Sequence, residues 1–185
     1  MATNRLIVQE QIATYAKLLF EAALNDGGSD GVLLTCIQGK QIAAAIHGNA
    51  EFDAALKDPG YTAVQKAELI RGVFADASPA LVNTLAVMAE RGEVDYLGRI
   101  MEQFEARMAD ELDIVIVEVE SAIQLDDHLR DLIKKKAETE LGKKAVLSER
   151  VNESLLGGII MSTRGERIDA SLLTQIEKIR DALQS

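Results

Sequence analysis

The spacing of apolar residues changes once along this chain, and that change restricts the fold to two regions of different kind. Up to about residue 110, apolar side chains recur every three to four positions, which is typical of helices that each bury one face. At residues 114–120 the sequence reads IVIVEVE, where β-branched residues run together and then alternate with glutamate, as in a strand. We therefore expect a helical region followed by a smaller mixed region.

Six helices are predicted before that change, over residues 4–26, 30–47, 50–57, 62–75, 78–92 and 94–112. Local signals fix several of their ends. The pair Gly27-Gly28 stops the first helix, because glycine is a poor helix former. Thr62 and Gln65 have the spacing of a capping box, in which each side chain accepts a backbone N–H of the first helical turn. Ser78-Pro79 marks another start, with serine as N-cap and proline at the first helical position.

Short elements alternate in the second region. We predict strands at residues 114–120, 144–151 and 158–162, a helix at residues 126–141, and a turn at residues 163–166. An amphipathic closing helix is expected to open at Asp169-Ala170-Ser171, because Asp169 and Ser171 are typical N-cap groups. The predicted fold is mainly α, with an N-terminal six-helix bundle over residues 1–112 and a small α+β domain over residues 113–185.

The net charge of −10 limits the possible partners. Most of it falls in the first 112 residues, which favours a basic or neutral protein partner and disfavours nucleic acid held by phosphate contacts. No stretch approaches the ~20 apolar residues that span a bilayer, and the first residues lack a signal-peptide core. We expect no direct membrane insertion, so that any membrane role would be exerted through partners.

The residues that most often carry chemistry do not form a catalytic pattern here. Cys36 lies in an apolar run and reads as a small buried side chain. His47 and His128 lie far apart in the sequence and lack the spacing of a metal site. Gly157-Gly158 precedes a strand and lacks the lysine of a phosphate loop, which leaves a conformational role such as positive φ. The sequence therefore predicts neither an enzyme nor a cofactor or metal site.

Two predicted helices carry more apolar surface than one core-facing stripe needs. In residues 4–26 one face holds Ile12, Ala16, Leu19 and Ala23, and a second holds Tyr15, Leu18 and Ala22. In residues 78–92 a stripe of Leu81, Leu85, Met88 and Ala89 is flanked by Asn83, Thr84 and Val87. The second stripes fit a groove for another helix, and they fit equally a central position in the bundle with burial on all sides.

Three segments spread over nearly the whole chain are distinctive when taken together. They are Tyr15-Ala16-Lys17-Leu18-Leu19-Phe20-Glu21; then Val87 to Gly92 followed by Leu97; and finally Val151-Asn152, Leu155, Gly157-Gly158-Ile159, Ile168-Asp169 and Ser171. In combination they resemble the δ subunit family of F-type ATP synthases, whose mitochondrial counterpart is the oligomycin-sensitivity-conferring protein. Ala170 stands where that family often has glycine, and Gly165 is displaced by one position.

The resemblance implies a non-catalytic stator subunit at the cytoplasmic face of a bacterial membrane, in one copy per complex. The bundle would bind the N-terminal helix of an α subunit in a groove between the first and fifth helices, and the second domain would bind the b subunits. Carried over residue by residue, the groove residues are Tyr15, Leu18, Asn83, Thr84 and Val87, and the b-contact residues are Leu155, Gly157, Gly158, Ile168 and Asp169. The alternative is a generic helical adaptor unrelated to ATP synthase.

Overall fold

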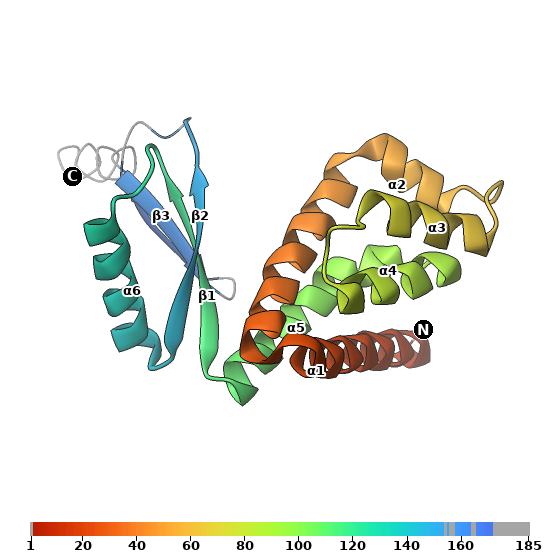
Figure 1. Cartoon of the computed structure of the whole chain (residues 1–185), viewed down its shortest axis with the longest axis horizontal. Helices are drawn as coiled ribbons and strands as arrows, with labels where there is room; N and C mark the ends of the chain where they lie inside the picture. The colour runs from red at the N-terminus through yellow and green to blue at the C-terminus, as the bar shows by residue number, and fades with distance from the viewer. Residues whose placement is uncertain (1, 154, 156–157, 164–165, 172–185) are drawn as a thin grey trace. The chain divides into compact units, whose positions relative to one another are not determined.

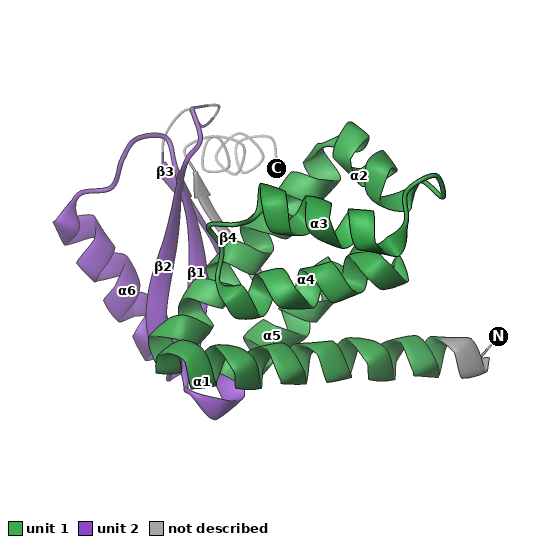
Figure 2. Cartoon of the chain, turned by 45° about the vertical axis from the view of Figure 1, so that its right-hand side comes forward, with its two compact units in different colours: residues 1–108 green, residues 109–185 purple. Residues whose placement is uncertain are grey.

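The chain forms two compact units, residues 1–108 (unit 1) and 109–185 (unit 2), which Figure 2 shows in different colours. The structure is a computed structural model that describes residues 2–153, 155, 158–163 and 166–171, with the side chains of residues 2–4 and 166–171 left out. The division between the units falls just before the predicted boundary after residue 112. The fold is mainly helical and includes one small sheet.

Unit 1 is built from helices (Figure 1). Its elements are α1 (Ala2–Gly48), α2 (Ala50–Lys57), α3 (Ala63–Val73), α4 (Pro79–Arg91), the 3₁₀ turn η1 (Val94–Tyr96) and α5 (Leu97–Glu111), which continues past the unit boundary. The third to sixth predicted helices correspond to α2, α3, α4 and η1 with α5, and their ends differ from the prediction by at most a few residues.

The first two predicted helices form one element with a sharp bend. Gly28 has φ 62° and ψ −149°, so the helix is interrupted where Gly27-Gly28 was predicted to end it. A Cβ placed on Gly31 would lie 2.7 Å from the carbonyl oxygen of Ala23. In a straight helix these two positions would be about 12 Å apart along the axis. The chain therefore turns back at Gly28 into a second arm of α1, and the count of six separate helices is not confirmed.

The predicted capping groups act as expected in unit 1. The backbone N–H of Gln65 donates to Thr62 Oγ1 at 3.3 Å, and the N–H of Thr62 donates to Gln65 Oε1 at 2.9 Å, which completes the capping box of α3. Ser78 caps α4 by accepting from the N–H of Leu81, with Pro79 at the first helical position. These caps satisfy backbone donors that have no partner within the helix, and they fix where α3 and α4 begin.

The core of unit 1 comes from one face of each helix. Phe20 of α1 and Phe104 of α5 pack edge to face with ring centroids 5.6 Å apart. Both predicted core stripes are buried: Ile12, Ala16, Leu19 and Ala23 on α1, and Leu81, Leu85, Met88 and Ala89 on α4. Cys36 is also fully buried, which confirms its prediction as a small core side chain.

Unit 2 is a four-stranded sheet with one described helix. Its elements are β1 (Ile114–Ser121), α6 (Asp127–Leu141), β2 (Lys144–Val151), β3 (Gly158–Thr163) and β4 (Glu166–Ser171), in the sheet order β2-β1-β3-β4. Strand β1 pairs in parallel with β2, and α6 makes the crossover between them; β1 pairs antiparallel with β3. Helix α6 packs on this sheet over a core of Ala109, Val115, Val117, Val119, Leu125, Ile133, Ala137 and Ala145.

The predicted start of the closing helix is corrected at Asp169. Asp169 is not a helix N-cap, because it belongs to strand β4, which pairs with β3 as far as Gly158↔Ser171. The pairs Thr163↔Glu166 and Ser162↔Arg167 set the register of a short hairpin, and a strand in register provides ladder hydrogen bonds that local capping cannot replace. The predicted closing helix lies outside the described residues.

Candidate partner-binding groove

An open groove of about 470 Å³ runs between the first arm of α1 and helix α4. It is lined by Ile7, Glu10, Gln11, Thr14, Tyr15 and Leu18 of α1 and by Val87 and Arg91 of α4. The lining therefore combines apolar bodies with polar tips and carries one acidic and one basic side chain. A groove of this composition suits an amphipathic helix, whose apolar face needs a matching surface while its flanks remain polar.

The burial of α1 and α4 decides between the two interpretations of their second stripes. Ile12 on the core face of α1 is 1% exposed, whereas Leu18 on the other face is 57% exposed. On α4, Leu85 is fully buried and Val87 is 39% exposed. The helices are therefore not buried on all sides, and part of each second stripe lines the groove.

The structure brings three of the five predicted groove residues together: Tyr15, Leu18 and Val87. The other two, Asn83 and Thr84, lie further back on α4 and do not line the groove. Asn83 is exposed, and the Thr84 hydroxyl donates to the carbonyl oxygen of Ala80 at 2.8 Å, within its own helix.

Sequence reasoning missed the remaining lining residues, Ile7, Glu10, Gln11, Thr14 and Arg91. A signal for the α1 residues was present, because positions 7, 11, 14 and 18 have the spacing of one helix face. Extending the second predicted stripe of residues 4–26 toward the N-terminus, with polar residues included, would have found them. Arg91 gave no such signal, since a basic residue in the last turn of a helix is usual in any context.

A hydrogen-bonded group fixes one end of the groove. The Tyr15 hydroxyl donates to Glu93 Oε2 at 2.6 Å, and Arg91 Nη1 donates to the same hydroxyl oxygen at 3.5 Å. Burial raises the pKa of Tyr15, and the hydrogen bond to the Glu93 carboxylate raises it further. Glu93 lies beyond the end of α4 and does not line the groove, so it acts on the groove only through Tyr15.

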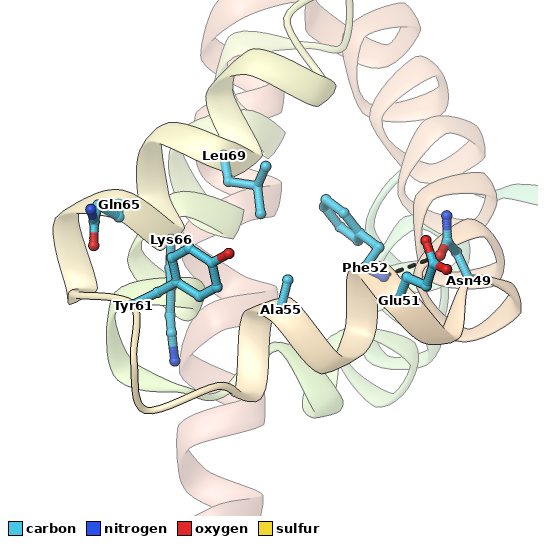
Figure 3. Close-up of a pocket in the computed structure, with 8 residues that line it drawn as sticks. All are labelled: Asn49, Glu51, Phe52, Ala55, Tyr61, Gln65, Lys66 and Leu69. Atoms are coloured by element: carbon cyan, nitrogen blue, oxygen red, sulfur yellow. Dashed lines mark hydrogen bonds between the residues drawn. The ribbon is translucent and has the colours of Figure 1, made fainter.

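A second cavity in unit 1, of about 530 Å³, lies between α2 and α3 (Figure 3). It is lined by Asn49, Glu51, Phe52, Ala55, Tyr61, Gln65, Lys66 and Leu69. Phe52 also packs edge to face against Phe74, with ring centroids 5.9 Å apart, and both rings are half-buried. None of the predicted site residues contributes to this cavity.

The predicted b-contact residues lie around the β3–β4 hairpin of unit 2. Leu155 is half-buried in the connection that leads to β3. Gly158 begins β3 with φ 83°, which confirms the predicted positive φ at this strand entry. Ile168 and Asp169 are on β4, opposite Met161 and Ile160 of β3. Gly157 lies outside the described residues.

No three histidine, cysteine, aspartate or glutamate side chains among the described residues are placed to hold a metal ion. None of the helices in the described part of the chain has both the length and the apolarity to cross a membrane.

The helices and open groove of unit 1 and the small sheet of unit 2 define a mainly helical protein of two compact units. The family model described as ATP synthase delta (OSCP) subunit matches residues 12–183. The chain therefore belongs to the ATP synthase delta (OSCP) subunit family.

Curated relatives agree with this assignment, and a solved structure shares the fold. The chain is 37% identical over 147 residues to the ATP synthase subunit delta of Geobacter metallireducens, covering 78% of this chain and 81% of the relative. It is 30% identical to that of Chromohalobacter salexigens, covering 92% and 94%. A chain of the Toxoplasma gondii mitochondrial ATP synthase hexamer, solved by cryo-EM, has the same fold with a TM-score of 0.57 at 18% identity, covering 94% of this chain and 97% of that one.

Proposed function

We propose that this chain is the non-catalytic stator subunit of an F-type ATP synthase, which links the catalytic head to the peripheral stalk. The observation that carries the proposal is the family match over residues 12–183. The curated relatives are named as the δ subunit of the same enzyme. An adaptor unrelated to ATP synthase is excluded by the family match, while the particular partners of each unit are part of the proposal.

Unit 1 is proposed to bind the N-terminal helix of an α subunit in the groove between α1 and α4. The exposed Leu18 and Val87 supply apolar area, and Tyr15 adds a large, rigid ring that loses little conformational entropy on binding. Asn83 and Thr84 would be reached only by a partner that extends along α4 beyond the groove.

Unit 2 is proposed to bind the C-terminal ends of the b subunits. The residues assigned to this contact are Leu155, Gly157, Gly158, Ile168 and Asp169, of which the described ones cluster at β3, β4 and the connection before them. Attachment of the two partners to two compact units gives each its own surface, so that neither contact has to be made at the expense of the other.

The proposed task is mechanical. A rotor that turns inside the head exerts torque on it, and the stalk must hold the head still. A clamp for this purpose needs slow dissociation, and most affinity differences between related complexes do reside in the dissociation rate. A groove already formed in the free protein serves that need, because little of the binding free energy is spent on ordering.

The location follows from the complex. The family assignment places the chain in an assembly that is peripheral to the membrane, and we propose the cytoplasmic face of a bacterial cell membrane, with one copy in each complex. Its attachment there would be made entirely through protein partners.

Affinity purification from native membranes tests the proposal. A tagged full-length chain, expressed at native level, should recover the ATP synthase α and b subunits together after mild detergent extraction. The tagged Leu18→Asp variant should recover much less α subunit when it is mixed with α subunit that has been dissociated from the purified complex. Absence of any ATP synthase subunit from the recovered material would contradict the stator assignment.

A further inference from the structure

We infer that Glu93 is a positioning residue for the groove: it holds the Tyr15 ring in place, although it does not line the groove itself. The inference rests on the proposed binding of an α-subunit helix in this groove. It assigns a role to a residue that lies outside the predicted site and just beyond the end of α4.

The backbone around Glu93 is held by the cap of α4. Gly92 adopts the left-handed conformation, with φ 69° and ψ 31°, and its N–H donates to the carbonyl of Ala89 at 3.2 Å. The N–H of Glu93 donates to the carbonyl of Met88 at 2.8 Å, which completes a Schellman-type helix end. The carbonyl of Glu93 accepts from the N–H of Tyr96 at 3.0 Å. Both backbone polar groups of Glu93 are therefore fixed, and its side chain is directed from a rigid position.

The side chain of Glu93 then ties two segments that are far apart in the sequence. Its Oε2 accepts from the Tyr15 hydroxyl at 2.6 Å, in a partly buried setting. Hydrogen bonds to an ionised carboxylate are short and stronger than those between neutral groups. A tyrosine side chain has only two rotatable bonds before its ring, so one strong bond at the hydroxyl restrains the whole ring.

Arg91 restrains the same hydroxyl from the groove side. Its Nη1 donates to the Tyr15 oxygen at 3.5 Å while that hydroxyl donates to Glu93. Tyr15 and Arg91 both line the groove, so the hydroxyl that Glu93 holds is also the acceptor for a second groove side chain. A partner helix would meet a ring that is already ordered, which lowers the entropic cost of binding.

Titration calorimetry on the full chain tests the inference, with a synthetic peptide of the α-subunit N-terminal helix from the same organism as the probe. Glu93→Ala should weaken peptide binding by about three- to tenfold, because the ring loses its hydrogen bond and must be ordered on binding. Glu93→Gln keeps an acceptor oxygen and should restore affinity to within about twofold of the native chain.

Tyr15→Phe provides a second, milder variant that keeps the ring and removes only the hydroxyl. If the two groups act as one unit, the double variant Tyr15→Phe/Glu93→Ala should bind no more weakly than the weaker single variant. Additive losses in the double variant would overturn the inference, as would failure of Glu93→Gln to restore binding.

Leu18→Asp separates this inference from the proposed function. If Leu18→Asp abolishes peptide binding while Glu93→Ala leaves it unchanged, the groove is the binding site and only the role of Glu93 is wrong. If Leu18→Asp also leaves the affinity unchanged, the groove assignment itself is wrong, and the inference falls with it.

Discussion

The two units differ in how their elements use apolar surface. In unit 1, helices α1 and α4 bury one stripe each and leave a second stripe open, so the core and the groove use different faces of the same helices. In unit 2, the first half of strand β1 is buried on both faces, with Ile114 and Ile116 on one side and Val115 and Val117 on the other. The exposed positions on α1 and α4 include apolar side chains, which reveals the candidate site of unit 1, whereas the exposed position on β1 is the charged Glu118.

The largest effect is expected from deleting the sheet-containing part of the chain. A chain truncated after residue 112 should keep a folded bundle that binds the α-subunit peptide and should no longer join the stalk at all, because the proposed b contacts all lie beyond that point. Circular dichroism and calorimetry test the bundle, and affinity purification tests the stalk contact. If the truncated chain is unfolded, the two units do not fold separately.

A core substitution should separate the stabilities of the units. Phe104→Ala removes a fully buried ring that packs on Phe20, and it should destabilise unit 1 by about 3–5 kcal/mol through lost burial and a residual cavity. The matched variant Val119→Ala should destabilise unit 2 instead, since Val119 lies on β1 and is fully buried in the core of unit 2. Chemical unfolding followed by circular dichroism should show one transition shifted in each case. Equal shifts of all unfolding signals would mean that the units unfold together.

A charge placed in the groove should affect binding more than folding. Tyr15→Asp removes aromatic contact area and buries a charge on binding, which should weaken the α-subunit peptide complex by at least about 1–2 kcal/mol. Asn83→Asp is the matched control, because it adds a similar charge to an exposed site on α4 that does not line the groove. Titration calorimetry should find a large loss for the first variant only. Equal losses for both would extend the binding surface along α4.

A side chain at the left-handed position that ends α4 should lower the stability of unit 1. Gly92→Ala should destabilise unit 1 by about 1 kcal/mol, because alanine pays a steric penalty at φ 69°. Gly98→Ala is the opposing control: Gly98 lies in α5 with open space around a new Cβ, so alanine should be neutral or stabilising by up to about 1 kcal/mol. Thermal unfolding measures both. A Gly92→Ala chain as stable as the native one would contradict the strained geometry.

The smallest effect concerns the ionisation of Tyr15. Burial and the Glu93 carboxylate raise its pKa in the folded chain. A raised pKa means that the protonated phenol is favoured by folding, so this contribution is fully present below the ordinary tyrosine pKa of about 10 and is lost as pH rises through the folded value. The phenolate absorbance of the native chain, minus that of Tyr15→Phe, should titrate above the ordinary tyrosine pKa of about 10. A difference curve at the ordinary value would contradict the Tyr15–Glu93 bond.

Local signals in the sequence were sufficient for most elements. The capping box at Thr62, the Ser78-Pro79 start and the β-branched run from Ile114 act over a few residues, and the structure has a helix or strand beginning at each. Two features depended on more distant partners. The fold-back of the two arms of α1 about Gly28 is set by how these arms pack, and the strand at Asp169 is set by β3.

The candidate groove was predictable in part for the same reason. Periodicity placed Tyr15, Leu18 and Val87 on spare faces of their helices, which the structure brings together. Which of their neighbours also line the groove depends on where α1 and α4 approach each other, and the sequence does not encode that in any local pattern. The role of Glu93 could not be predicted from the sequence, because its hydrogen bond with Tyr15 joins two residues that come together only in the folded chain.

The bend of α1 at Gly28 also bears on the order of folding during synthesis. It brings Gly31 next to Ala23, so the first contacts between the two arms join residues close in the chain and can form early. The central strand β1 must instead wait for β3, since Glu118 pairs with Ser162. Unit 1 should therefore be folded on the ribosome before the sheet of unit 2 can close, which pulse proteolysis of stalled nascent chains would detect. The growing chain would then present a finished groove to an α subunit while its stalk-binding end is still being made.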